Sequence, residues 1–274
     1  MFSKMFKNQQ RRANYSVLRI GAHHSPQWLM GDYRKYRTVF EAAEIDFIYV
    51  EVVLHNLRFQ QEDWSCKMKL IAYWQQMDGT EQKAYEVTEK YTISKDLDRA
   101  YLSNSWGAPE KGGYWAQGVC RVEAYIDGQL VGDVYIAIEK ENFKNKEINP
   151  YFELEEVKIF STSTDVPPIN QRVYSKTFVA AQTPYLAFEI NLHNKLDYIW
   201  NCEFVGNFYN EEGEQLITQR GLQPIEPTEK KAAVLVSYGN ETCDYWHTGK
   251  YTVKILFMEK IIDEVAFEVV VNPS

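Results

Sequence analysis

Alternating apolar and polar residues predict short β-strands along most of the chain. Two stretches show this pattern clearly, and their alternate apolar members are Trp64, Cys66, Met68, Leu70 and Ala72 in the first and Trp200, Cys202, Phe204 and Phe208 in the second. A period of two places these side chains on one face of a half-buried strand. Each stretch ends near a glycine, Gly79 or Gly213, which supplies the positive φ that a turn requires.

The two stretches belong to a longer repeat. The sequence EVVLHN at residues 51–56 returns as EINLHN at residues 189–194, and the pair Tyr114-Trp115 returns as Tyr245-Trp246. Two copies of a unit of this length predict two similar domains in tandem rather than a solenoid.

The end of each copy predicts a two-strand hairpin. Alternate apolar residues lead into a turn and return from it in both copies. The first copy turns at Asp127-Gly128, which is a strong signal for a two-residue hairpin loop. The second copy has Met258-Glu259 at this place, so we expect a different loop geometry there.

Each copy therefore offers about seven short strands with no convincing helical stripe, which is typical of an immunoglobulin-like β-sandwich. The predicted fold class is all-β, with two tandem immunoglobulin-like β-sandwich domains related by internal duplication. We expect a flexible N-terminal arm at residues 1–16, a first domain at 17–140, a linker at 141–155 and a second domain at 156–274.

Composition narrows the possible partners and the cell compartment. The 274 residues are 45% hydrophobic and 15% aromatic, which is enough for two ordinary cores. A net charge of −8 argues against a nucleic-acid or membrane partner, because phosphate binding relies on Lys and Arg. The sequence lacks an apolar stretch suited to export or to membrane spanning. We predict a cytoplasmic protein, with removal of an export signal as the alternative.

Cysteine positions agree with a reducing compartment. Cys66 and Cys202 are equivalent in the two copies, but Cys120 and Cys243 have no equivalent cysteine. A shared disulfide is therefore impossible, and we expect free buried thiols.

The Tyr-Trp pairs allow two interpretations. Paired aromatic rings at the mouth of a strand suit stacking on a sugar or gripping a peptide, whereas in a sandwich they plug the open end between the sheets. We favour the structural interpretation because both copies have the pair. Possible ligand-binding residues are Trp106, Trp115 and Trp246.

The repeated histidines do not form an acid–base pair with the glutamates that precede them. His55 and His193 share a strand face with Glu51 and Glu189, but four residues along a strand span about 13 Å. We expect all four side chains to be solvated or at a sheet edge.

The remaining motifs predict no catalytic residues, no cofactor and no metal. His23 and His24 are expected in an ordinary loop, because no Asp, Glu or Cys nearby completes a ligand set. No nucleophile, base and orienting group can be assembled, and phosphate-binding motifs are absent from the sequence.

The closing region of each copy resembles a recurrent bacterial module. The shared pattern is a Trp, a Gly, alternating apolar residues, a turn and a closing apolar strand, at Trp115, Gly118 and Val122 to Ile138 and at Trp246, Gly249 and Val253 to Val269. It resembles the tandem immunoglobulin-like repeats that precede the ATPase core of some large bacterial AAA-family proteins. The resemblance implies a recognition or assembly arm, here without the ATPase.

These observations favour a non-catalytic scaffold of two sandwich domains that binds another protein or a larger assembly, through end loops or sheet edges. The segments that differ most between the copies are 80–106 against 214–234 and 108–113 against 239–244. One alternative is a carbohydrate-binding module that uses exposed Tyr and Trp. A second alternative is a hydrolytic enzyme whose site is built from loops.

Overall fold

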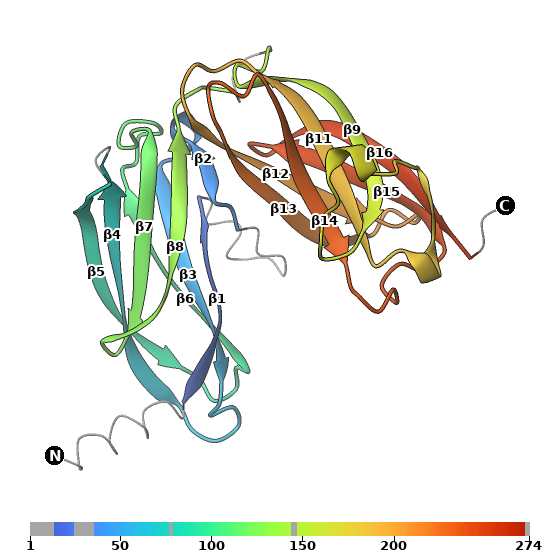
Figure 1. Cartoon of the computed structure of the whole chain (residues 1–274). Helices are drawn as coiled ribbons and strands as arrows, with labels where there is room; N and C mark the ends of the chain where they lie inside the picture. Colours follow the sequence, from blue (N-terminus) through green and yellow to red (C-terminus); the bar gives the residue numbers. More distant parts are fainter. Residues whose placement is uncertain (1–13, 25–35, 77–78, 144–146, 272–274) are drawn as a thin grey trace. The chain divides into compact units, whose positions relative to one another are not determined.

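The structure, a computed structural model, describes residues 14–24, 36–76, 79–143 and 147–271. The chain divides into two compact units, Met1–Lys140 and Glu141–Ser274. Apart from three short 3₁₀ turns, the regular structure of the described residues is β-strand (Figure 1).

Unit 1 consists of two sheets. The three-stranded sheet has the order β1-β3-β6 and the five-stranded sheet has the order β2-β8-β7-β4-β5. All neighbours are antiparallel except β2 and β8, which are parallel. The strands are β1 (Tyr15–His23), β2 (Val39–Glu41), β3 (Phe47–Asn56), β4 (Trp64–Gln75), β5 (Glu81–Ile93), β6 (Arg99–Gly107), β7 (Gly118–Ile126) and β8 (Gln129–Glu139), with η2 (Ala42–Glu44) after β2.

Unit 2 has the same plan. Its described residues form sheets with the orders β9-β11-β14 and β10-β16-β15-β12-β13, in which β10 and β16 run parallel. The elements are β9 (Phe152–Thr162), η3 (Ile169–Gln171), β10 (Thr177–Val179), η4 (Ala180–Gln182), β11 (Tyr185–Asn194), β12 (Trp200–Tyr209), β13 (Gln215–Ile225), β14 (Lys231–Gly239), β15 (Gly249–Phe257) and β16 (Lys260–Val270).

The duplication extends to irregular features. The β1–β3 pair and the equivalent β9–β11 pair each contain a register shift that leaves one residue without a partner, Leu18 in β1 and Glu155 in β9. A matching slip in the closing hairpin leaves Val131 unpaired in unit 1 and Ile262 unpaired in unit 2. Because bulges are specific local features, their recurrence supports descent of both units from one plan. The predicted all-β fold with two β-sandwiches is confirmed.

The alternation in β4 and β12 gives each sandwich its core. Trp64 and Trp200 are the first inward-facing residues of β4 and β12, and their exposed fractions are 8% and 0%. In unit 1 these side chains join a core built from both sheets, which includes Val52 of β3 and Val122 of β7. The polar residue Lys67 is exposed, as the period of two predicts.

Both closing hairpins turn through the same geometry. The φ angles are 49° at Asp127 and 82° at Gly128, and 45° at Met258 and 65° at Glu259. Two consecutive left-handed residues are characteristic of a type I′ turn, whose twist matches that of the strands. The expectation of a different loop in the second copy is therefore wrong, because the strand twist imposes the turn even where neither residue is glycine.

The strands extend past two of the predicted domain limits. β1 begins within the predicted arm, 1–16, and residues 1–13 of that arm lie outside the described residues. β9 begins within the predicted linker, 141–155. Phe143 and Tyr151 of that linker are buried against Phe257, with ring centroids 5.4 and 5.2 Å away, so they belong to the core of unit 2.

Candidate functional site

The three tryptophans identified as possible ligand-binding residues are core residues. Trp106, Trp115 and Trp246 have exposed fractions of 3%, 5% and 2%. Trp115 donates its indole hydrogen to the carbonyl oxygen of Asp46 at 3.1 Å, and Trp246 packs edge-on against Phe267. A ring that stacks on a ligand must present a face to solvent, so these three rings cannot do so. Burial at the sandwich end supports the structural interpretation of the Tyr-Trp pairs.

The asparagine of the repeated LHN sequence is a buried structural residue. Asn56 accepts hydrogen bonds from the Trp64 indole at 2.9 Å and the Arg58 amide at 2.9 Å. Its side-chain amide donates to the carbonyl oxygens of Ser94 and Leu97 at 3.1 and 2.8 Å. These bonds tie the end of β3 to the inward tryptophan and to the β5–β6 loop.

The equivalent asparagine of unit 2 makes a similar set of bonds. Asn194 accepts from the Trp200 indole at 3.1 Å and the Leu196 amide at 3.0 Å, and donates to the carbonyl oxygen of Glu226 at 3.2 Å. The histidine beside each asparagine is more exposed, as expected for His55 and His193.

The prediction for Glu51 and Glu189 is wrong, because both are buried. Glu51 accepts a hydrogen bond from the Tyr36 hydroxyl at 2.6 Å, and Glu189 accepts one from the Tyr174 hydroxyl at 2.9 Å. Glu189 also forms an ion pair with Arg172. Burial alone would raise the pKa of Glu189, but these hydrogen bonds, that of Arg172 first, lower the pKa on balance. Each carboxylate thus anchors the long connection after the first strand.

A glycine in β1 allows Tyr36 to lie close to the three-stranded sheet of unit 1. A Cβ atom at Gly21 would lie 2.4 Å from Cδ1 of Tyr36, so the tyrosine ring rests directly on the β1 backbone. Sequence periodicity could not reveal this arrangement, because the buried carboxylate lies on the strand face that alternation assigns to solvent.

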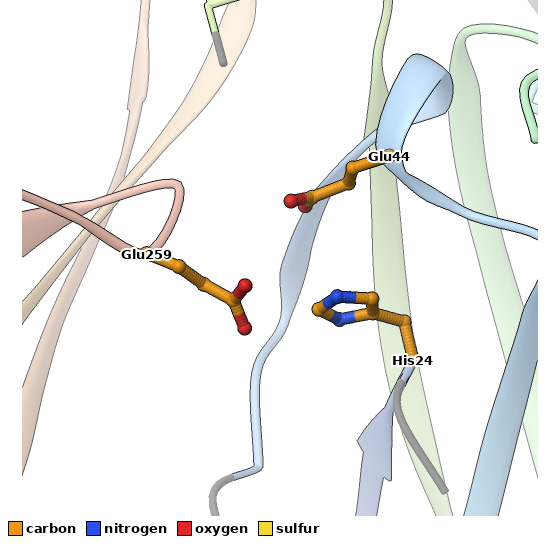
Figure 2. Close-up of side chains that lie close together, drawn as sticks. All are labelled: His24, Glu44 and Glu259. Atoms are coloured by element: carbon orange, nitrogen blue, oxygen red, sulfur yellow. The ribbon is translucent and has the colours of Figure 1, made fainter. Parts of the chain in front are cut away.

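His23 lies in a strand rather than in the expected loop, whereas His24 follows the end of β1 in a bend. His23 ends β1, is buried, and stacks on Tyr49 with ring centroids 5.2 Å apart. Figure 2 shows the His24 ring and the Glu44 carboxylate of unit 1 extending in the same direction; Glu259, also labelled there, belongs to unit 2. Two side chains are fewer than the three or four protein ligands of zinc sites.

Glu44 is instead held by a cation of its own unit. Its carboxylate lies 2.8 Å from Nη2 of Arg37, and both side chains are buried. Burial alone would raise the pKa of Glu44, but the positive charges of Arg37 and His24 lower the pKa on balance.

All four cysteines are free thiols, and burial disfavours the thiolate form of Cys66 and Cys120. Cys66, Cys120 and Cys202 are buried, while Cys243 is half-buried, which departs from the expectation for that residue. Burial raises the pKa of Cys66 to about 11 and that of Cys120 to about 12. Both therefore remain protonated at neutral pH, whereas catalytic cysteines act as thiolates.

The outer face of the five-stranded sheet of unit 1 carries a row of large side chains. Tyr73, Arg121 and Tyr135 lie opposite one another on β4, β7 and β8. Arg121 donates to both carboxylate oxygens of Glu81 at 2.8 and 2.5 Å and to Glu123 at 2.6 Å, and lies 5.1 Å from the centre of the Tyr73 ring. The hydrogen bonds to Glu81 raise the pKa of Arg121 most strongly.

The equivalent row of unit 2 carries small side chains. Tyr209, Thr252 and Ala266 lie opposite one another on β12, β15 and β16. Threonine and alanine thus replace the arginine and the second tyrosine of unit 1. A cavity of about 680 Å³ lies over this row, and we call it the unit 2 groove.

Charged residues border the unit 2 groove on both sides along the strands. Lys250 lies opposite Glu268, and Lys254 lies opposite Glu264 with 3.9 Å between their charged atoms. Nζ of Lys254 also lies 5.1 Å from the centre of the Tyr209 ring. Aligning the two closing hairpins could have revealed this site, because the loss of two large side chains between equivalent strands is visible in the sequence.

Comparisons with known proteins do not place the chain in a family. No family model matches it, and no curated protein matches it in sequence. The solved structures that resemble it include a red sea bream transglutaminase, with 13% identity, a TM-score of 0.30, and coverage of 98% of this chain and 33% of that chain.

Two further structures resemble parts of the chain. A cycloisomaltooligosaccharide glucanotransferase from Paenibacillus sp., complexed with cycloisomaltoheptaose, has 12% identity and a TM-score of 0.30, over 47% of this chain and 14% of that chain. An alkylpurine DNA glycosylase from Pseudomonas fluorescens, bound to DNA, has 10% identity and a TM-score of 0.28, over 44% and 30%. The chain spans a third or less of these proteins, and scores at this level carry no inference about function.

Proposed function

We propose that the protein is a non-catalytic scaffold of two immunoglobulin-like β-sandwiches that binds a partner protein through the free edge of β5 in unit 1. The strand order supports the immunoglobulin-like assignment, because a short strand runs parallel to the last strand at one edge of each five-stranded sheet. The free thiols support a cytoplasmic location. No helix in the described part of the chain has the length and apolar character needed to cross a membrane.

The observation that carries the proposal is the length and exposure of β5. This strand has 13 residues, and most of its side chains are exposed. Among the described residues, β4 is the strand hydrogen-bonded to β5, so the outer edge of β5 presents unpaired N–H and C=O groups. An extended segment of another protein can add to such an edge as a further strand.

The two units differ at this place. In unit 1, the hydroxyls of Tyr85 and Tyr91 bridge from β5 to the carbonyl oxygens of Ser105 and Ser103 in β6, at 3.2 and 2.6 Å. In unit 2, the backbones of β13 and β14 meet, because a Cβ atom at Gly221 would lie 2.1 Å from the carbonyl oxygen of Leu235. In unit 1, tyrosine side chains therefore bridge β5 and β6, whereas in unit 2 the backbones of the equivalent strands approach each other directly.

Proline substitutions at two adjacent positions test the proposal. Along a strand, successive residues direct their N–H groups to opposite sides, so one of Thr88→Pro and Glu89→Pro, both at exposed positions, removes a bond to β4 and the other alters the free edge. Thermal unfolding of the intact chain identifies the variant that keeps its stability. That variant should lose a partner captured with the tagged intact chain and then purified. Unchanged affinity of the stable variant would exclude strand addition at β5.

The two alternatives have less support. The carbohydrate-binding alternative loses the buried rings of Trp106, Trp115 and Trp246 as contacts. The hydrolytic alternative has no activated nucleophile among Cys66 and Cys120, whose thiols remain protonated at neutral pH.

A further inference from the structure

We infer that the unit 2 groove binds a neutral oligosaccharide of two or three sugar residues. This inference goes beyond the scaffold function, since it concerns a different unit and a different class of ligand. It rests on the dimensions of the groove, the balance of charge around it and its comparison with unit 1.

The groove has the size of a small ligand rather than of a protein surface. Its cavity of about 680 Å³ falls within the roughly 300–1,000 Å³ range of ligand sites. From Lys250 to Lys254, four residues of β15 span about 13 Å, and the two strand spacings from β12 to β16 span about 10 Å. A di- or trisaccharide fits this area, whereas a folded partner would need a much larger one.

The charges around the groove cancel. Three lysines and three glutamates line it, namely Lys176, Lys250, Lys254, Glu211, Glu264 and Glu268. This balance provides no attraction for a strongly anionic or cationic ligand. It does provide ammonium donors and carboxylate acceptors on the same rim, and sugar hydroxyls both donate and accept hydrogen bonds.

The central row provides an apolar surface between these polar groups. Tyr209 contributes its ring, whose centre lies 5.1 Å from Nζ of Lys254, and the small side chains of Thr252 and Ala266 leave space above the sheet. The C–H face of a sugar ring can lie on this row while its hydroxyls reach the lysines and glutamates. Burial of apolar area and directional hydrogen bonds would then act together.

Unit 1 is a natural comparison within the same chain. There Arg121 extends over the ring of Tyr73 and is fixed by Glu81, and Tyr135 occupies the position of Ala266. A cation lies over the tyrosine ring in both units, Arg121 in unit 1 and Lys254 in unit 2. The two large side chains Arg121 and Tyr135 are replaced by Thr252 and Ala266 in unit 2, so restoring them there is a specific way to remove the site.

Titration of the intact, isotope-labelled chain by NMR tests the inference. The probes are maltotriose, cellotriose, xylotriose, mannotriose and tri-N-acetylchitotriose, with trigalacturonic acid as an anionic probe. At least one neutral trisaccharide should shift the amide resonances of Tyr209, Thr252 and Ala266. The double variant Thr252→Arg/Ala266→Tyr, which restores the side chains of unit 1, should weaken that binding at least tenfold.

Two further variants separate loss of the site from loss of the fold. Leu222→Arg places the same charge on an exposed position of β13 outside the groove and should bind as the unmodified chain does. Tyr209→Leu removes the aromatic ring without adding a larger side chain to the groove, and it should also weaken binding at least tenfold. The inference is overturned if no neutral probe shifts these resonances, if both groove variants bind normally, or if the anionic probe binds more tightly.

Discussion

Replacement of Asn56 by alanine should be among the most damaging single changes in unit 1. The substitution removes four hydrogen bonds, two accepted and two donated by the side chain. At about 0.5–1.5 kcal/mol each they contribute about 2–6 kcal/mol, and the stranded Trp64 indole adds a part of the roughly 1–3 kcal/mol cost of an unpaired buried group. We expect a loss of about 4 kcal/mol in the free energy of unfolding.

Urea unfolding of the intact chain, followed by tryptophan fluorescence, measures this loss. With a slope of about 2 kcal/mol per molar urea, a loss of about 4 kcal/mol moves the midpoint of the affected transition by about 2 M. The matched control is His55→Ala, the exposed neighbour in the same motif, which should change stability by less than about 0.5 kcal/mol. Equal and small effects of the two substitutions would refute the structural role of the asparagine.

Three other predictions concern the core, a turn and a buried carboxylate. Trp64→Ala and Trp200→Ala should each cost about 3–5 kcal/mol of unfolding free energy, and Lys67→Ala less than about 0.5 kcal/mol; similar values for all three would invert the face assignment. Gly128→Ala should lower the free energy of unfolding by about 1–2 kcal/mol in the same assay, because φ is 82° at this position. The new Cβ meets no atom within 4 Å, so a steric clash does not contribute to this cost. A neutral effect would contradict the turn geometry. Because the pKa of Glu189 is lowered in the folded state, its contribution is present above the unfolded pKa and is lost as pH falls through the folded pKa. The Glu189→Gln variant should therefore be less stable than the unmodified chain at pH 7. Between about pH 5 and 3 its free energy of unfolding should fall less than that of the unmodified chain. Parallel plots of unfolding free energy against pH would show that the Glu189 carboxylate is not the group responsible.

The architecture was predictable because core positions recur in both copies. Trp64 and Trp200 identify the inward face of β4 and β12, and that face fixes the register of each five-stranded sheet. The geometry of the second closing turn was not predictable from Met258 and Glu259, because strand twist overrides the local preference of these residues.

The polar network and the groove were harder to predict for different reasons. Glu51 and Glu189 occupy positions that the period of two assigns to solvent, and their partners Tyr36 and Tyr174 lie fifteen residues upstream across a long connection. The groove exists because Thr252 and Ala266 are small. A small residue at an outward strand position does not by itself predict a binding site, and it becomes informative only when it is compared with the equivalent residue of unit 1.

Hydrogen exchange of the tryptophan indoles, measured by NMR on the intact chain, tests most directly whether one sandwich plan with matching inward side chains occurs twice. The indole hydrogens of Trp64 and Trp200 are both bound to a buried asparagine, so both should exchange only when their unit unfolds. Exchange of either indole at the rate of a solvent-exposed tryptophan would contradict that plan.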